Sequence, residues 1–250
     1  MFKVFYKEEV GSTNDWAKEE SITNAVFVAD YQTNGRGRLE RVWESPKGVN
    51  LCFSIKIKIE DYVQAIHYNF LTSLAVAKTL EEEYSLVTTI KWPNDILMEN
   101  KKLSGVLSEI DSGAPQPPKG GASEGINVII GVGINCNFDI NDNSPIKKIA
   151  TSLHYYLGYI DKEVLLEKIL ICFNILNEEY KKTEFKKILK KWNKYANIEG
   201  RMLYTTISNK KEVVKVIKMN NDASLIVERK DGRIETLIAG DIEYVEDTNN

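Results

Sequence analysis

Apolar and polar positions recur along the chain with two different periods. Residues 50–59 alternate with a period of two, which predicts a strand with one buried face. Residues 63–80, and most of residues 162–191, place apolar side chains three or four positions apart, which predicts amphipathic helices. Shorter apolar runs predict strands at 2–6, 25–31, 88–92, 95–98, 103–110 and 128–135. The expected fold class is α+β, with helices covering a sheet.

Composition marks a helix start and a loop. Ser12 can accept hydrogen bonds from free backbone N–H groups, and Asp15 follows three positions later, as in a helix N-cap. Residues 112–125 are rich in Gly, Pro, Ser and Ala, which predicts an exposed, mobile loop between two strands.

The pattern changes near residue 197. Short β-rich runs follow it, separated by turn signals such as Asn220-Asn221-Asp222 and Lys230-Asp231-Gly232. About 50 residues are too few for a large core of their own. We therefore expect two domains, a main domain over 1–197 and a small β barrel or sandwich over 198–250 that packs against it.

Composition narrows the class of protein. Apolar residues make up 43% of the chain and charged residues 28%, as in an ordinary soluble globular protein. The 33 basic and 36 acidic side chains give a net charge of -3, which argues against nonspecific nucleic-acid binding as the main activity. Three separated cysteines and two histidines predict neither a disulfide framework nor a structural metal site, and the expected location is cytoplasmic. No run reaches the roughly 18 apolar residues of a membrane span.

Gly35-Arg36-Gly37-Arg38, with Arg41 close behind, is the densest group of cationic donors in one predicted loop. Two glycines allow the backbone to approach a ligand closely, and planar guanidinium groups suit carboxylate and phosphate. Taken alone, the run is equally compatible with an exposed basic turn. The chain contains neither a phosphate-binding GxxxxGK[ST] loop nor a complete GxGxxG dinucleotide motif.

Three further segments carry candidate chemistry, each with a purely structural alternative. Lys91-Trp92-Pro93-Asn94-Asp95 could direct polar side chains into a pocket, or could be a polar turn beside a buried Trp. Lys101-Lys102-Leu103-Ser104-Gly105 could lie along a ligand, although an ordinary hairpin is the better explanation in isolation. Gly131-Val132-Gly133-Ile134-Asn135 could allow close backbone approach, or could be a bulge.

Together these segments resemble the biotin–protein ligase family. Ser12-Thr13-Asn14 is similar to its first motif, and residues 31–38 with Arg41 and Trp43 are similar to its biotin and adenylate loop. The other three segments follow in family order, so the resemblance spans roughly residues 10–137. It implies a class II synthetase-like catalytic domain with a mixed sheet, and the β-rich tail resembles the family's small SH3-like domain.

The resemblance also implies roles for individual residues. Biotin would be bound by Ser12, Thr13, Asn14, Gln32, Arg36, Gly37, Arg38, Lys102 and Gly105. The nucleotide would be bound by Arg36, Arg38, Arg41, Trp43, Asn94 and Asn135, and the catalytic cations would be Arg38, Lys91 and Lys102. No residue is assigned as a dedicated metal ligand, although Mg²⁺ is expected with ATP.

The implied reaction forms biotinyl-5′-AMP from biotin and ATP and then transfers biotin to a lysine of a biotin carboxyl carrier protein. Two alternatives remain open, a lipoate- or octanoate-transferring enzyme and a noncatalytic biotin-sensing protein. Because little sequence precedes Ser12, the simple class without a DNA-binding domain is expected, and DNA is not an expected partner. A homodimer joined through an exposed strand is compatible with the pattern. Glu40 stands where the family loop usually has a second Gly.

Overall fold

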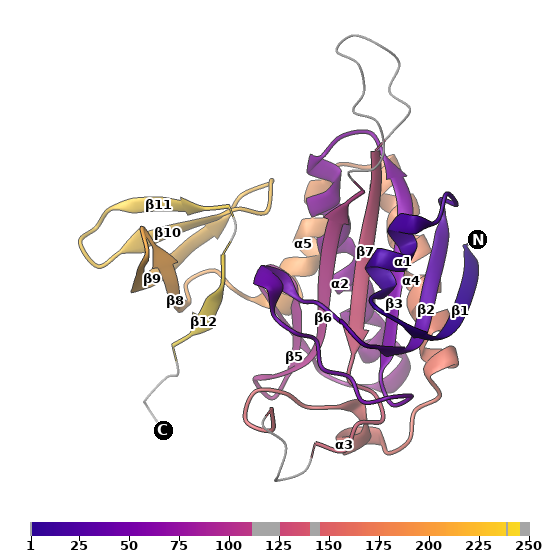
Figure 1. Ribbon diagram of the computed structural model, residues 1–250. Helices are drawn as coiled ribbons and strands as arrows, with labels where there is room; N and C mark the ends of the chain where they lie inside the picture. The colour runs from indigo at the N-terminus through magenta and orange to yellow at the C-terminus, as the bar shows by residue number, and fades with distance from the viewer. Residues whose placement is uncertain (1, 112–125, 141–145, 239, 246–250) are drawn as a thin grey trace.

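The computed structural model describes residues 2–111, 126–140, 146–238 and 240–245. The loop expected at 112–125 lies outside the described residues, and so does the side chain of Glu40. Two sheets are present, a large one with helices on both faces and a smaller C-terminal one beside it (Figure 1). The predicted boundary at residue 197 falls between the last helix and the first strand of the smaller sheet.

The large sheet has seven strands in the order β1-β2-β3-β7-β6-β5-β4. Only β1 and β2 run parallel among these pairs, so the sheet is mixed, as expected. Its strands are β1 (Lys3–Val10), β2 (Ala25–Gln32), β3 (Leu51–Ile59), β4 (Thr89–Lys91), β5 (Asp95–Met98), β6 (Lys101–Ile110) and β7 (Ile126–Ile134). The alternation in residues 50–59 therefore forms β3, near the middle of the sheet.

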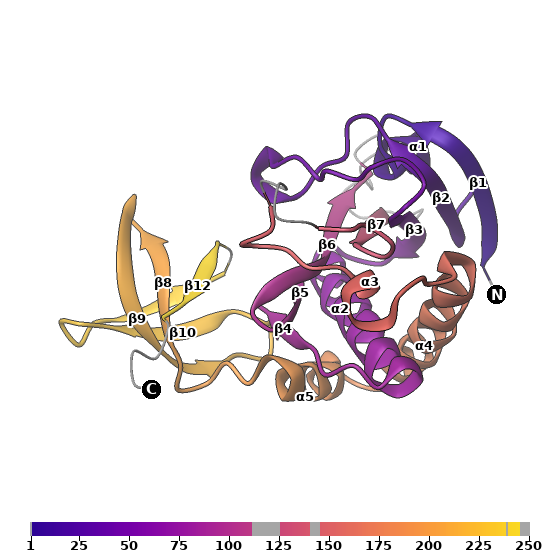
Figure 2. The same cartoon turned by 90° about the horizontal axis from the view of Figure 1, so that it is seen from below.

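Helices α2, α4 and α5 cover one face of this sheet, and α1 lies on the other (Figure 2). The helices are α1 (Thr13–Glu19), α2 (Val63–Tyr84), α3 (Leu153–Leu157), α4 (Lys162–Lys182) and α5 (Phe185–Ala196), with a 3₁₀ turn, η1, at Arg38–Glu40. The main core lies between the sheet and α2, where Phe53, Leu74 and Trp192 are buried. On the α1 face a smaller apolar cluster, which includes Trp16 and Phe27, lies next to the polar groups at 12–14.

Residues 162–191 are mostly helical, as predicted, and they form two helices with a break at 183–184. Their apolar stripe passes from Tyr180 to Phe185, a spacing of five that cannot continue along one helix face. Thr183 takes an extended backbone conformation, and its hydroxyl donates back to the carbonyl of Glu179 at 2.9 Å. The second helix, α5, then turns Phe185 and Trp192 into the core.

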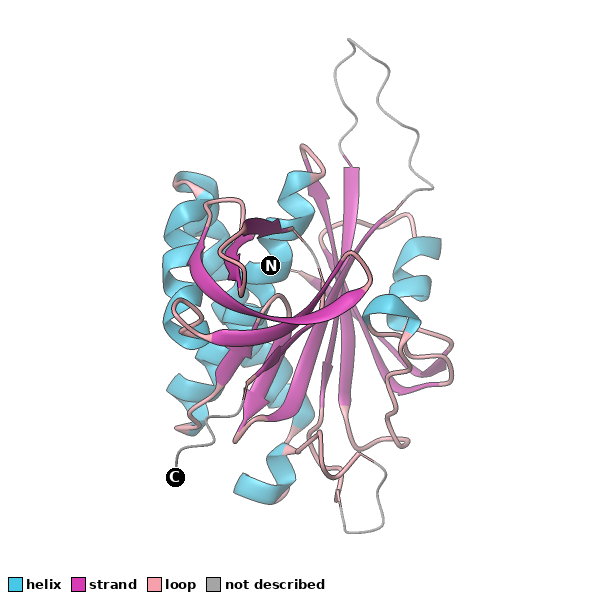
Figure 3. Ribbon diagram, turned by 90° about the vertical axis from the view of Figure 1, so that its left-hand side faces the viewer, coloured by secondary structure: helices cyan, strands magenta, loops and turns pink. Residues whose placement is uncertain are grey.

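The C-terminal sheet has five antiparallel strands in the order β11-β10-β9-β8-β12. Figure 3 views the molecule from the side that bears this sheet. The strands of this sheet are β8 (Met202–Ile207), β9 (Lys210–Met219), β10 (Leu225–Arg229), β11 (Ile234–Leu237) and β12 (Ile242–Tyr244). The indole N–H of Trp92 donates to the carbonyl of Ala223 at 2.9 Å, so the turn after β4 is attached to this sheet. Among the described residues, no helix has the length and hydropathy needed to cross a membrane.

Candidate active site

A cavity of about 1100 Å³ lies on the α1 face of the large sheet and reaches the C-terminal sheet. It is large enough for a ligand of nucleotide size. The structure brings all of the predicted site residues to its lining, namely Ser12, Thr13, Asn14, Gln32, Arg36, Gly37, Arg38, Arg41, Trp43, Lys91, Asn94, Lys102, Gly105 and Asn135. Five segments that are distant in sequence therefore share one cavity.

A buried polar wall closes one end of the cavity where α1 begins. The side-chain oxygen of Gln32 accepts from the Thr13 backbone N–H at 2.8 Å and from its hydroxyl at 3.1 Å. The hydroxyl of Ser54 lies 2.8 Å from the Thr13 hydroxyl and 2.6 Å from the Asn14 side-chain oxygen. Gly131 leaves room for this amide, because a Cβ there would lie 2.4 Å from the Asn14 oxygen. The wall is thus held by strands β2, β3 and β7.

Arg36 and Arg38 point their guanidinium groups to opposite sides of their loop. Arg36 makes two hydrogen bonds to Asp15 on α1, at 2.5 and 2.6 Å. This pairing lowers the pKa of Asp15 and raises that of Arg36. Arg36 thereby faces the α1 end of the cavity, and its predicted place beside a ligand carboxylate remains a prediction.

Arg38 extends toward β5 and the C-terminal sheet. It donates to the side-chain oxygen of Asn94 at 3.1 Å and to the Gly240 carbonyl at 2.8 Å, and it lies 3.8 Å from the Asp241 carboxylate. Arg41 also pairs with Asp241. These guanidinium groups form the cationic centre of the cavity, with one carboxylate of the C-terminal sheet between them.

Lys102 lies near the same centre. Its amine pairs with Asp95 at 2.7 Å and lies 5.6 Å from the centre of the Trp43 ring. Gly105 leaves space for the lysine, because a Cβ there would come within 3.1 Å of the Lys102 amine. Asp95 thus holds the Lys102 amine in the cavity, where an anionic ligand could replace the Asp95 carboxylate as its partner.

Trp43 lies against β7. A Cβ at Gly133 would lie 2.4 Å from its ring, so only glycine allows this approach. The indole N–H of Trp43 is buried without a hydrogen-bond partner among the described residues. A flat apolar ring with a free donor suits contact with a planar heterocycle. The geometry is compatible with the adenine-covering role predicted for Trp43.

The two predicted asparagines are held by backbone groups. The amide nitrogen of Asn94 donates to the Val106 carbonyl at 2.6 Å, while that of Asn135 donates to the Thr151 carbonyl at 3.0 Å. Asn50 donates to the Asn135 side-chain oxygen at 3.2 Å. Both residues are fixed in the lining, and their direct contact with nucleotide or metal remains a prediction.

The cavity offers binding groups rather than an activated nucleophile. Among the described residues that line it there is no cysteine or histidine. Burial raises the pKa of Cys52 and raises that of Cys136 to about 12, so both thiols stay protonated at neutral pH. Ser12 acts as the N-cap of α1 by accepting from the Asn14 backbone N–H. The arrangement favours catalysis by positioning and charge neutralisation.

Sequence reasoning missed Asp15, Ser54, Glu109 and Asp241. Glu109 had a detectable signal, because it lies on the same face of β6 as Gly105 and Leu107 by strand alternation. Ser54 stands within the alternating segment of residues 50–59, where the pattern indicates only a small buried residue. Asp241 had no local signal, since only the tertiary structure brings it to Arg38.

Comparison with known proteins shows the family of this chain. The family model described as the biotin/lipoate A/B protein ligase family matches residues 7–135, just over half of the chain. The bifunctional ligase/repressor BirA of Bacillus subtilis is 33% identical over 247 residues, covering 96% of this chain and 73% of that protein. The biotin–[acetyl-CoA-carboxylase] ligase of Mycobacterium tuberculosis is 32% identical over 139 residues, covering 51% of this chain and 47% of that protein. The chain therefore belongs to the biotin/lipoate A/B protein ligase family.

The fold extends this similarity to both sheets. The solved biotin protein ligase from Aquifex aeolicus in complex with biotin and ATP matches with a TM-score of 0.79 at 26% identity, covering 97% of this chain and 98% of that chain. The expected fold, with a mixed catalytic sheet and a small C-terminal β domain, is thus confirmed.

Proposed function

We propose that this protein is an ATP-dependent biotin–protein ligase. The observation that carries the proposal is one continuous cavity that joins the polar wall at Ser12–Asn14 to the cationic centre at Arg38. The wall offers neutral donors and acceptors that suit the uncharged ureido ring of biotin. The cationic centre suits its carboxylate and the phosphates of ATP.

The first step joins two anions. A carboxylate oxygen of biotin attacks the α-phosphorus of ATP. The bond between the α-phosphorus and the oxygen that it shares with the β-phosphorus breaks, and pyrophosphate leaves. Two unit charges 4 Å apart interact by about 4 kcal/mol at an effective dielectric of 20, so like charges repel by a similar amount. Arg38, Arg41 and Lys102 would offset that repulsion, with Lys91 as a further cation in the lining.

The second step needs no covalent enzyme intermediate. The amine of a carrier lysine attacks the acyl carbon of biotinyl-AMP, loses a proton, and forms an amide as AMP leaves. We propose a biotin carboxyl carrier protein as the acceptor, because the M. tuberculosis relative is named as a biotin–[acetyl-CoA-carboxylase] ligase. Each relative reported above is named as a biotin ligase or ligase/repressor, which favours biotin over lipoate and catalysis over sensing alone.

Magnesium would enter with ATP. Among the described residues, no three His, Cys, Asp or Glu side chains gather as a metal-ligand set. Mg²⁺ commonly keeps several waters and binds mainly through substrate phosphates, and it would supply charge neutralisation at the departing pyrophosphate. The side-chain oxygens of Asn94 and Asp95 lie in the lining and face Arg38 and Lys102, so the structure assigns no protein ligand to the ion.

The test is incubation of the protein with ATP, biotin and a biotin carboxyl carrier domain, read by intact mass. We expect one biotin to be added to one lysine, and no addition without ATP or when that lysine is replaced by arginine. The same assay with labelled lipoate tests for a lipoate-transferring enzyme. Transfer of lipoate but not of biotin would support that alternative. Tight biotinyl-AMP binding with no labelled carrier would support the sensing protein and contradict the proposal.

A further inference from the structure

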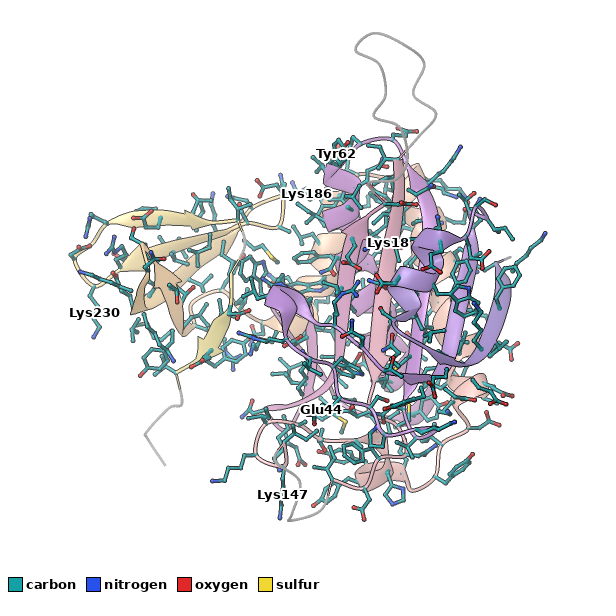
Figure 4. All side chains as sticks on the ribbon, in the orientation of Figure 1. Lys18, Glu44, Tyr62, Lys147, Lys186 and Lys230 are labelled. Atoms are coloured by element: carbon teal, nitrogen blue, oxygen red, sulfur yellow. The ribbon has the colours of Figure 1, made fainter. Side chains whose placement is uncertain are left out.

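Four charged side chains form a network at the α1 end of the cavity, which we call the Glu109 network. It consists of Asp15, Lys18, Arg36 and Glu109, and the side chain of Asn14 contacts it. Glu109 lies 3.7 Å from Arg36 and 3.3 Å from Lys18, while Arg36 also binds Asp15 with two hydrogen bonds. Figure 4 labels Lys18 on α1, which lies on the same face of the large sheet as the cavity. The members come from α1, the loop after β2, and β6.

Glu109 determines how the Asn14 amide is oriented. The amide nitrogen donates to Glu109 at 2.6 Å, while its oxygen lies 2.6 Å from the Ser54 hydroxyl. Asn14 is only 4% exposed, so an unpaired amide N–H there would lack water to replace the lost acceptor. These two contacts leave one N–H and one lone pair of Asn14 available to a ligand.

The same carboxylate also acts on the loop. Arg36 is drawn toward α1 by Asp15 and Glu109, and its backbone forms a β-bridge with Val42. The loop backbone at Gly35 lies next to the polar wall, since a Cβ there would come within 3.1 Å of the Gln32 side chain. Glu109 thus connects one wall of the cavity to the loop that borders it.

The charges of the network balance, because two carboxylates face one guanidinium and one ammonium. The α1 end of the cavity therefore carries no surplus charge, in contrast to the centre at Arg38. A balanced, rigid polar end suits the uncharged ureido ring of biotin. The surplus cations near Arg38 suit the carboxylate of biotin and the phosphates of ATP.

We infer that Glu109, supported by Asp15, is a positioning residue for biotin, which orients Asn14 and fixes the Arg36 loop without touching the reacting atoms. This inference rests on the proposed function. It predicts that Glu109 controls biotin affinity and has little effect on ATP.

The experiment measures biotin binding by calorimetry without ATP, and KM for ATP in a pyrophosphate-release assay at saturating biotin. Glu109→Ala is expected to weaken biotin binding about tenfold, equal to about 1.4 kcal/mol, and to leave KM for ATP within about twofold. Glu109→Gln keeps an acceptor for Asn14 but loses the charge, so it should restore part of the affinity. Asp15→Asn should weaken biotin binding less than Glu109→Ala, since Glu109 still faces Arg36.

Glu178→Gln is the matched control, because it removes an exposed carboxylate paired with Lys181 on α4, away from the cavity. Wild-type protein that fails to bind biotin would contradict the proposed function. Wild-type binding with an unchanged affinity in Glu109→Ala would overturn only this inference, as would an equal rise in KM for ATP. Should Glu109→Ala fail to fold, an unchanged affinity in Glu109→Gln and Asp15→Asn would overturn it in the same way.

Discussion

The guanidinium of Arg38 lies 3.8 Å from the carboxylate of Asp241, although the two residues come from opposite ends of the chain. Arg38 also donates to the neighbouring Gly240 carbonyl at 2.8 Å. The short segment before β12 therefore helps to place Arg38, a cation that lines the cavity. Through this contact the C-terminal sheet contributes to the lining of the cavity.

Replacing the two arginines should have unequal effects. The Arg38 side chain is 22% exposed and contacts Asn94, whereas that of Arg41 is 66% exposed. Loss of a well-placed charge donor costs about a hundredfold or more in rate, while an exposed ion pair is worth at most about 1 kcal/mol. Arg38→Ala should therefore slow pyrophosphate release about a hundredfold, and Arg41→Ala less than about tenfold.

The control for this comparison is Arg233→Ala, which removes an exposed arginine paired with Asp231 in a turn of the C-terminal sheet. Its pyrophosphate release should match that of the wild type. Unchanged release in Arg38→Ala would count against the assignment of the site, and an equal loss in Arg41→Ala would contradict the ranking by burial.

Substitutions of two glycines in β7 should affect biotin and ATP differently. A methyl group at Gly131 would meet the Asn14 oxygen at 2.4 Å, and one at Gly133 would meet the Trp43 ring at 2.4 Å. Gly131→Ala is expected to weaken biotin binding more than tenfold, because Asn14 is held by Ser54 and cannot move freely. Gly133→Ala is expected mainly to raise KM for ATP, because it displaces Trp43.

Gly11→Ala serves as the control, since a Cβ there would meet nothing within 4 Å. Calorimetry with biotin and steady-state kinetics with ATP give the two readouts. Equal effects of both β7 substitutions on both substrates would show that they act by general disruption of the strand.

Asp15 should contribute to stability in a pH-dependent way. The hydrogen bonds from Arg36 lower its pKa below the ordinary value of 3.8. A lowered folded-state pKa stabilises the protein above the unfolded value, and that contribution is lost as pH falls through the folded value. Asp15→Asn should thus be less stable than wild type at pH 7, and the difference should vanish in strong acid. Urea unfolding from pH 7 down to about pH 2 measures it; a difference independent of pH would contradict the pairing.

Lys56 should be important for the position of α1. Its side chain is 2% exposed, and its amine donates to the carbonyls of Ala17 and Glu20 at 3.0 and 2.7 Å and pairs with Asp111 at 3.0 Å. Removal of one partner from a buried ion pair costs about 3–5 kcal/mol. Lys56→Met should lower the free energy of unfolding by roughly 3 kcal/mol in urea. Lys58→Met, at an exposed position of the same strand, should have little effect, and similar losses in both would contradict a special role for Lys56.

The strands and helices with strong periodicity were predictable from the sequence. Alternation predicted β3, and three- or four-residue spacing predicted α2. The short helix α3 was missed, because five residues hold too little periodicity to detect. Strand β1 runs to Val10, well beyond the predicted 2–6, because register with β2 extends a polar segment that has no apolar signal of its own.

The sequence by itself, through the order of its motifs, predicted a set of residues that line one cavity. Glycines, arginines and asparagines in a characteristic order are chemical requirements that a linear pattern can carry, and all fourteen predicted residues reach the cavity. Only the tertiary structure decided which carboxylates hold them. Asp241 reaches Arg38, and Glu109 reaches Asn14, across elements that are distant in the chain. Such pairings depend on the distance between side chains after folding, and neither composition nor local periodicity encodes that distance.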